Sequence, residues 1–349
     1  MGKVQPIIEA ILAAALYAAS IPFAKLILTQ IDPFMLAGFL YLGAGLGMAA
    51  WIFFQSRSVQ QKPAKNSFTQ GDLFYLIGMV VLDIFAPILL MFGVRATSSA
   101  TASVLNNLEI VMTALIAWIF FREKISLRLW LGLIFVIIAG VLVSATGEKL
   151  ELTIGALYIL GATACWGLEN NFTRALAERD SRKIVLIKGL GSGTGAIALG
   201  LLAGESFPFF SIALLTMIVG YLSYGLSINF YIQAQKTLGA AKTSAFYAIN
   251  PFISVLLSMI FLKERPLPIF YTGVAAMTVG TIFIVLDTLY RSHAHKHLHV
   301  HAHLHVHNQD LHYHEHVHVH THQHGHVLQE DQHAHLHRNL PGHDHLHGE

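Results

Sequence analysis

Long apolar segments recur along the first 290 residues of this 349-residue chain, and they restrict its fold more than any other feature. Charged residues make up only 12% of the chain, and its mean hydropathy is +0.56. A segment of about 20 apolar residues is long enough for a helix to cross a hydrocarbon core roughly 30 Å thick. Lipid leaves the edges of an open sheet without hydrogen-bond partners. The sequence therefore predicts an all-α membrane protein and excludes a soluble one.

Hydropathy, read together with Gly, Pro and charged residues between the segments, predicts ten membrane-spanning helices. The first segment lacks a small-residue cleavage site, so we expect it to be a retained helix and not a removed signal peptide. The approximate bounds of the ten segments are 5–27, 33–54, 71–94, 97–121, 126–145, 152–174, 183–203, 208–233, 238–262 and 267–289.

Lys and Arg are distributed unevenly between the two ends of these segments, and loops rich in them stay in the cytoplasm. If the N-terminus is cytoplasmic, most of these residues fall on the cytoplasmic side. They are Lys3, Arg57, Lys62, Lys65, Arg122, Lys124, Arg128, Arg174, Arg179, Arg182, Lys183, Lys236, Lys242, Arg291 and Lys296. The opposite side keeps Lys25, Arg95, Lys149, Lys263 and Arg265. We therefore expect a multi-pass protein of the inner membrane with both termini in the cytoplasm.

The chain contains an internal repeat. A shift of 141 residues aligns Arg122-Glu123 with Lys263-Glu264, and it aligns Gly132 with Gly273. Five helices in each half is an odd number, so the second copy must be inverted relative to the first. Inverted repeats are typical of secondary transporters, whose solute site lies near the membrane midplane between the halves. We expect one repeat in residues 1–145 and the other in residues 146–290.

Each half opens with an aromatic and a small residue, Tyr17-Ala18 and Trp166-Gly167, and ends its fourth helix with Arg122-Glu123 or Lys263-Glu264. In this order and spacing the chain, over about residues 5–289, resembles EamA-type permeases of the drug/metabolite transporter superfamily. In the first half Tyr17-Ala18 stands where Trp-Gly is commoner. The resemblance implies a ten-helix inner-membrane carrier with a central cavity, which moves small metabolites, often outward.

Polar side chains at membrane depth are the candidates for a solute or coupling site, because ionisable groups there usually face the bundle interior or water. Asp83 and Glu109 lie near the middle of the third and fourth segments, where desolvation suits a carboxyl to proton coupling. Asn106, Glu109 and Thr113 are spaced to form one stripe on a helix. The full set of candidates is Asp83, Asn106, Glu109, Glu169, Asn170, Tyr247 and Asn250.

The alternative for the amides in this set is packing, since Asn side chains often link membrane helices by hydrogen bonds. Lys25 and Lys188 can extend along their stems towards an interface, so we expect both to be structural. The single Cys165 excludes a disulfide framework within the chain and a Cys-based zinc site.

All 22 histidines lie between His293 and His347, and most alternate with other residues. Clustered imidazoles suit Ni, Zn and Co, so we expect the tail of residues 291–349 to bind a divalent transition metal. Its composition predicts disorder in the absence of metal. The Val and Leu residues between the histidines leave strand structure templated by metal as an alternative. The candidate ligands are His293, His295, His297, His299, His301, His303, His305, His307, His312, His314, His316, His318, His320, His322, His324 and His326.

The leading hypothesis is a secondary active transporter, not an enzyme, that exports a small organic solute and whose metal-binding cytosolic tail regulates transport. One alternative is a transporter of a divalent metal or its chelate. Another is a membrane-anchored protein that stores or senses metal in its tail. No cofactor is required in the leading hypothesis. The expected partners are the lipid bilayer, the solute, transition metal ions and a second copy in a homodimer, but not nucleic acid.

Overall fold

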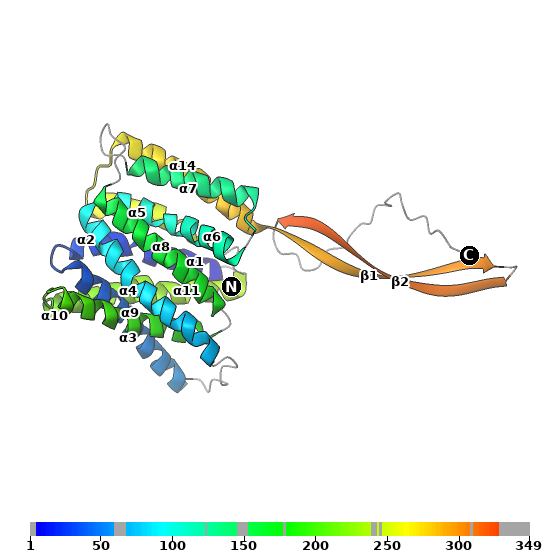
Figure 1. The fold of residues 1–349 in the computed structure, drawn as a ribbon, viewed down its shortest axis with the longest axis horizontal. Coiled ribbons are helices and arrows are strands. Elements are labelled where there is room, and N and C mark those ends of the chain that lie inside the picture. The colour runs from blue at the N-terminus through cyan, green and yellow to red at the C-terminus, as the bar shows by residue number, and fades with distance from the viewer. Residues whose placement is uncertain are drawn as a thin grey trace. The chain divides into compact units, whose positions relative to one another are not determined.

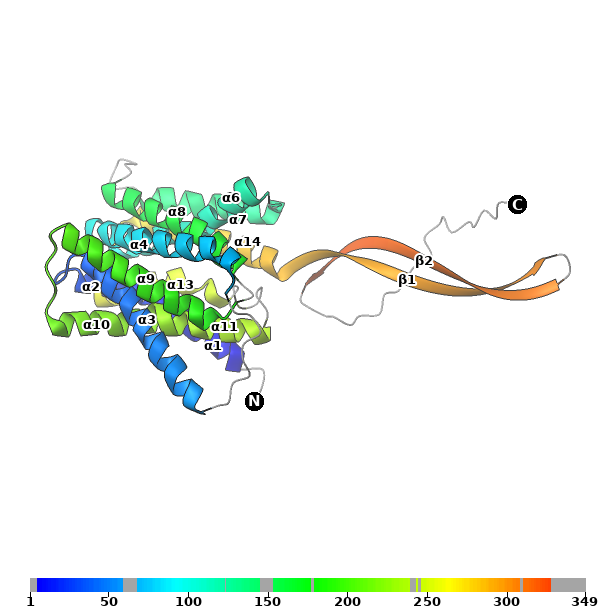
Figure 2. The ribbon, with the colours of Figure 1, turned by 60° about the horizontal axis from the view of Figure 1, so that its bottom comes forward.

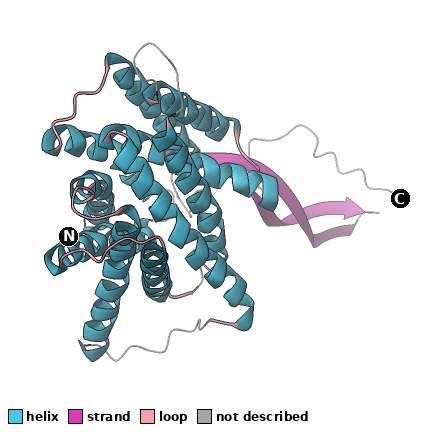
Figure 3. Ribbon diagram, turned by 60° about the vertical axis from the view of Figure 1, so that its left-hand side comes forward, coloured by secondary structure: helices cyan, strands magenta, loops and turns pink. Residues whose placement is uncertain are grey.

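The computed structural model of the chain describes residues 5–58, 68–122, 124–144, 153–176, 179–238, 243, 246–307 and 310–327. They divide into two compact units, Met1–Thr288 and Leu289–Glu349, which are treated separately. Every regular element that begins in the first unit is a helix, as Figure 3 shows. Glu123, which belongs to one of the repeat motifs, lies outside the described residues.

The helices follow the predicted segments closely. In the first half they are α1 (Gln5–Ala18), α2 (Ser20–Ile27), α3 (Pro33–Ser58), η1 (Gln70–Asp72), α4 (Leu73–Ala96), α5 (Ser99–Asn106), α6 (Leu108–Phe121) and α7 (Leu127–Val143). In the second half they are α8 (Ile154–Ala175), α9 (Ser181–Leu202), α10 (Phe210–Gly220), η2 (Tyr221–Leu226), α11 (Ser227–Leu238), α13 (Asn250–Phe261) and α14 (Pro268–Leu289).

Seven helical stretches of the described residues are long and apolar enough to cross a membrane by length and composition. They are Gln5–Ile27, Pro33–Phe54, Gln70–Ala96, Ser99–Phe121, Arg182–Leu202, Phe210–Tyr231 and Pro268–Asp287. Leu127–Val143 and Asn250–Phe261 are shorter apolar helices. Large apolar side chains such as Phe120 and Leu127 are exposed on the outside of the bundle. In water this surface would be unfavourable, whereas lipid accepts it, so the chain is a multi-pass membrane protein.

The helices α7 and α14 lie side by side in Figures 1 and 2, and the residues in contact between them are related by the internal repeat. A Cβ on Gly132 would lie 3.0 Å from the carbonyl oxygen of Gly280, and one on Gly273 would lie 3.2 Å from that of Ala139. Because Gly132 aligns with Gly273 and Ala139 with Gly280, the two contacts are the same contact seen from each half. The repeated small residues therefore let the two helices pack closely about a local two-fold axis.

Arg122 and Lys263 are a second pair of equivalent residues. Both have a positive φ, 54° and 53°, and they are the non-glycine residues in that region among the described ones. Arg122 caps the end of α6 in the left-handed conformation that often ends a helix. Such a conformation is unusual for a side chain of this size. The same backbone conformation therefore follows α6 in the first half and α13 in the second.

The sequence predicted continuous helices, and this is wrong at four places. The first segment is interrupted at Ala19, the fourth at Asn107 and the ninth just before Asn250. The eighth changes to a π-helix over Tyr221–Leu226. Pro22 and Pro251 each lack a backbone donor, and Asn side chains compete for backbone hydrogen bonds, so these residues weaken a helix locally. The predicted stripe of Asn106, Glu109 and Thr113 is consequently divided between two helices, α5 and α6.

The second unit contains two strands, β1 (Tyr290–His307) and β2 (Asp310–Val327), which form an antiparallel hairpin. The prediction of a disordered tail does not hold for these two segments. Their alternation of His with Val, Leu and Ala has the period of a strand, and pairing satisfies the backbone groups of both. Residues 328–349 lie outside the described residues.

Candidate functional site

A cavity of about 510 Å³ lies inside the helical unit and draws its lining from both halves. All four helix interruptions contribute to it. Ser20 follows the first, Asn107 forms the second, and Asn250 follows the third. Tyr224, within the π-helix, lines it as well. Interrupted helices at membrane depth are tolerated where they face a cavity, because groups freed from the helix can be solvated there. The interruptions thus mark the site.

Six of the seven candidate residues line this cavity. They are Asn106, Glu109, Glu169, Asn170, Tyr247 and Asn250. The seventh, Asp83, does not line it but contacts Lys188, which does. Among the residues that the structure describes, no group of three or more His, Cys, Asp or Glu could hold a metal ion.

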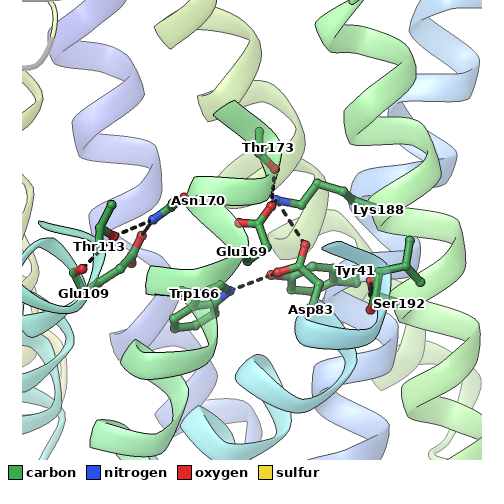
Figure 4. A network of polar contacts seen from close by, with 11 residues as sticks. Tyr41, Asp83, Glu109, Thr113, Trp166, Glu169, Asn170, Thr173, Lys188 and Ser192 are labelled. Atoms are coloured by element: carbon green, nitrogen blue, oxygen red, sulfur yellow. Dashed lines mark hydrogen bonds and ion pairs between the residues drawn. The ribbon is translucent and has the colours of Figure 1, made fainter. Parts of the chain in front are cut away.

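One polar cluster in the cavity wall is built around Lys188, as Figure 4 shows. Its Nζ lies 3.0 Å from Oδ2 of Asp83 and 2.8 Å from Oε1 of Glu169. The side chains of Asp83 and Glu169 are 0% and 2% exposed. These residues come from α9, α4 and α8, so one ammonium joins a helix of the first half to two of the second. Lys188 therefore lines the cavity and pairs with buried carboxylates, and it does not extend to an interface as the sequence suggested.

Further hydrogen bonds hold the two carboxylates. The Tyr41 hydroxyl donates to Oδ1 of Asp83 at 3.4 Å, and Nε1 of Trp166 donates to the Tyr41 oxygen at 3.3 Å. The Thr173 hydroxyl donates to Glu169 from one turn further along α8. Trp166, Glu169 and Thr173 are spaced to lie along one face of that helix, which carries much of the site. The sequence did not point to Tyr41, because its hydroxyl is joined to Asp83 only by the fold.

Glu109 lies in a second cluster, between α6 and α8 (Figure 4). Nδ2 of Asn170 donates to Oε1 of Glu109 at 2.8 Å and to the Thr113 hydroxyl at 3.2 Å. Gly167 allows the two helices to come this close, since a Cβ there would lie 2.7 Å from Cβ of Met112. Among the described side chains, the ion pairs include none with Glu109. Within the part of the chain that the structure describes, Glu109 therefore shares its charge with an amide and has no ion-pair partner.

At one end of the helical unit, two carboxylates of the second half accept hydrogen bonds from the backbone of the first half. Glu264 accepts hydrogen bonds from the backbone nitrogens of Ser99 and Ala100, at 2.7 and 2.8 Å. Glu205 accepts them from Phe34 and Met35. Both carboxylates thus cap the N-terminus of a first-half helix, where negative charge is favoured. Burial raises the pKa of Glu205 more than these two hydrogen bonds lower it.

Lys25 lies at the same end, and its Nζ donates to the carbonyl oxygens of Val94 and Thr97, both at 2.6 Å. Nearby, the hydroxyls of Ser99 and Ser258 are 2.8 Å apart, and those of Ser103 and Ser254 are 2.7 Å apart. The halves are therefore in direct contact beside the cavity, through hydrogen bonds that a small separation would break.

Residues 5–145 and 153–286 each match the EamA-like transporter family. An uncharacterized transporter of Methanothermobacter thermautotrophicus is 21% identical over 290 residues, which cover 76% of this chain and 81% of that protein. A probable terminal-alkyne amino-acid exporter of Streptantibioticus cattleyicolor is 24% identical over 215 residues, 58% of this chain and 70% of that protein. A solved structure described only as the crystal structure of a protein matches with a TM-score of 0.59 at 15% identity, over 82% of this chain and 98% of that one, and shares its fold.

Proposed function

The chain belongs to the EamA-like transporter family, and from that membership we propose that it is a secondary active transporter, which exports a small organic solute across the inner membrane. Its ten helical segments are proposed to span the membrane as two inverted five-helix repeats. The observation that carries this proposal is the cavity between the halves, lined at the points where helices are interrupted. A cavity at such a place is where a carrier of this architecture holds its solute.

Two features support transport by movement of one half against the other. The contacts that join the halves at one end are hydrogen bonds of Ser99, Ser103 and Glu264, each of which can break and form again. The close contacts of α7 with α14 at Gly132 and Gly280 are related by the repeat. A symmetric contact of this kind gives the two halves a common axis about which to rock.

Glu109 and Asp83 are the proposed coupling carboxylates. A carboxylate in a cavity within the membrane is costly while it is charged and without a cation, so it tends to exchange a proton for a charged partner. Glu109 meets this description best, since Asp83 is already paired with Lys188. Asn106, Glu169, Asn170, Tyr247 and Asn250 are the proposed solute contacts.

Both termini are proposed to be cytoplasmic, as the distribution of Lys and Arg favours. This topology puts the Arg179–Asp72 ion pair on the cytoplasmic side. It puts the contacts of Lys25, Glu205 and Glu264 on the opposite side. Attaching a reporter that fluoresces only in the cytoplasm after Thr288 tests the orientation. A signal is expected, and a dark reporter would reverse the topology.

The transport proposal is tested by profiling metabolites and metals in cells that make or lack the protein. A small organic solute should be depleted inside and enriched outside when the protein is present, and amino acids are among the first to quantify. Glu109→Gln should abolish this difference, whereas Glu9→Gln, near the end of the first span, should not. A change confined to a metal ion would instead favour the metal transporter, and no change at all would contradict transport.

We also propose that the tail binds a divalent transition metal, Ni, Zn or Co, and thereby regulates transport. The register of β1 with β2 supports this, because seven cross-strand pairs place His opposite His. They run from His293–His324 to His305–His312 at every second position of the register. Directly opposite residues in an antiparallel pair have Cβ atoms about 4.5–5.5 Å apart, close enough to share one ion.

The test compares the full-length protein with a variant that lacks residues 291–349. Equilibrium dialysis against Ni should show several ions bound to the full chain and few to the shortened one. Equal binding by both would contradict a metal site in the tail. If the metal regulates transport, Ni should change solute flux only in the full-length protein. If metal is the cargo, cells that make the protein should differ in metal content from cells that lack it, with or without residues 291–349.

A further inference from the structure

Five tyrosines line the cavity and form a continuous chain of ring contacts. They are Tyr17, Tyr41, Tyr224, Tyr231 and Tyr247. The ring centroids of Tyr17 lie 5.7 Å from Tyr224 and 5.9 Å from Tyr247. Tyr41 adjoins Tyr224 at 5.5 Å, and Tyr231 adjoins Tyr247 at 5.0 Å. These residues belong to helices of both halves, so the fold has gathered them at one place.

Tyrosine faces carry negative potential and attract a cation that lies within about 6 Å of the ring centroid. With rings spaced 5.0 to 5.9 Å apart, a small cation beside one of them is also near its neighbour. The same cavity contains the carboxylate of Glu109, for which the described side chains offer no ion-pair partner. A row of tyrosine rings beside a carboxylate that has no ion-pair partner among the described residues is suited to bind an organic ammonium ion.

Asn106 provides a second, independent observation. Its side chain is 6% exposed, it lines the cavity, and its Oδ1 has no hydrogen-bond donor among the residues that the structure describes. A buried acceptor left without a donor is unfavourable. An N–H group of a solute would satisfy it. A protonated primary or secondary amine has such a group, whereas a quaternary ammonium ion does not.

The charge around the cavity distinguishes an amine from an amino acid. Lys188 is the ammonium in the lining, and both Asp83 and Glu169 already contact it. Together with Glu109, these residues put three carboxylates beside one lysine, whose charge the two carboxylates that contact it already balance. A second negative charge on the solute would be repelled, while a positive charge would be attracted.

We infer that the cavity binds a small organic cation carrying a protonated amine and no carboxylate, with its ammonium between Glu109, Asn106 and the tyrosines. This inference rests on the proposed transport function and names the chemical class of its solute. Because the ammonium and a proton would occupy the same carboxylate in turn, the two would be exchanged in opposite directions. Export of an amine against entry of a proton follows from this competition.

The test measures equilibrium binding to the purified full-length protein in detergent, by calorimetry, with three probes of one shape. Phenethylammonium carries the cation, 2-phenylethanol replaces it by a neutral hydroxyl, and phenylalanine adds a carboxylate. Phenethylammonium is expected to bind at least tenfold more tightly than either of the others. Equal binding of the alcohol, tighter binding of phenylalanine, or no binding of phenethylammonium would overturn the inference.

Variants locate the site. Glu109→Gln should weaken phenethylammonium binding at least tenfold, Tyr247→Leu at least threefold, and Tyr247→Phe, which keeps the ring, less than twofold. Asn106→Asp should tighten it, which a misfolded variant could not do. Unchanged affinity in both Glu109→Gln and Tyr247→Leu would place the probe elsewhere and refute the assignment. Flux of another solute in a protein that binds no amine would reject the solute class alone, whereas absence of any solute flux would reject transport itself.

Discussion

Replacing Lys188 by methionine removes the ammonium that Asp83 and Glu169 share. The two N–O distances are 3.0 and 2.8 Å. With an effective dielectric constant of about 20, unit charges at such a separation attract by roughly 6 kcal/mol. The cost of removing ions from water offsets much of this, but loss of one partner leaves the others buried and unpaired, which costs about 3–5 kcal/mol. We expect Lys188→Met to lower the free energy of unfolding by an amount in that range.

The measurement is unfolding of the purified protein in mixed detergent micelles, followed by tryptophan fluorescence. Lys183→Met is the matched control, since Lys183 is exposed on the same helix and its loss should change stability by less than about 0.5 kcal/mol. In the double variant Asp83→Asn, Lys188→Met, one of the stranded charges is gone, so part of the stability should return. A coupling energy of at least about 1 kcal/mol between the two sites is expected. Additive effects, with coupling below about 0.5 kcal/mol, would show that the cluster is not held by its charges.

Three further predictions concern packing and the closed end of the helical unit. Gly167→Ala would bring a Cβ to 2.7 Å from Met112 and should cost about 1–3 kcal/mol in unfolding free energy. Gly71→Ala, where a Cβ would lie 3.8 Å from its nearest neighbour, should cost little. Equal effects would argue against a close approach of α6 and α8. Glu264→Gln weakens two charge-assisted hydrogen bonds to α5 and should lower thermal stability by the equivalent of about 1–2 kcal/mol. An unchanged melting temperature would count against a stabilising role of Glu264 at the N-terminus of α5. The pKa of Glu205 is raised in the folded protein, so its contribution to stability should fall as pH rises from the usual carboxyl range through the raised value. Glu205→Gln should remove that component from melting temperatures measured over a pH series. An identical pH profile in the variant would refute the prediction.

Much of the helical architecture could be predicted from the sequence, because lipid imposes length and polarity on each segment separately. The repeat could be predicted too, and Arg122 with Lys263 shows why: the same short motif ends a helix with the same backbone conformation in both halves. The pairing of Gly132 with Gly280 follows from the same alignment once the two-fold relation is known.

The site could be predicted only in part. Polarity at membrane depth singled out Glu109 and Asn170, which the structure brings to 2.8 Å of each other. Lys188 was missed because a lysine near the end of a segment can also reach the interface, and only the packing of α9 against α4 and α8 reveals its partners. The presence of buried Asp83 and Glu169 in a chain with so few charges was the signal that could have suggested a partner.

The tyrosines and the helix interruptions were harder still. Tyr224 and Tyr231 suit a membrane helix whether or not they face a cavity, so sequence pattern does not distinguish them. The interruption at Asn107 involves no proline, and it depends on competition between side-chain and backbone hydrogen bonds. In the tail, the alternation that suits metal binding also suits a strand. Composition favoured disorder there, whereas pairing of two such segments supplies backbone hydrogen bonds that neither has alone.

The most direct test of the central claim, that the two halves move about the cavity to carry a solute, is a reversible cross-link between them. Ser99 and Ser258, whose hydroxyls are 2.8 Å apart, are replaced by cysteine in a Cys165→Ala background. Export of the solute identified by metabolite profiling is then measured after oxidation and again after reduction. The disulfide should stop export, and reduction should restore it. Export at the same rate with the halves cross-linked would contradict movement of the halves about the cavity.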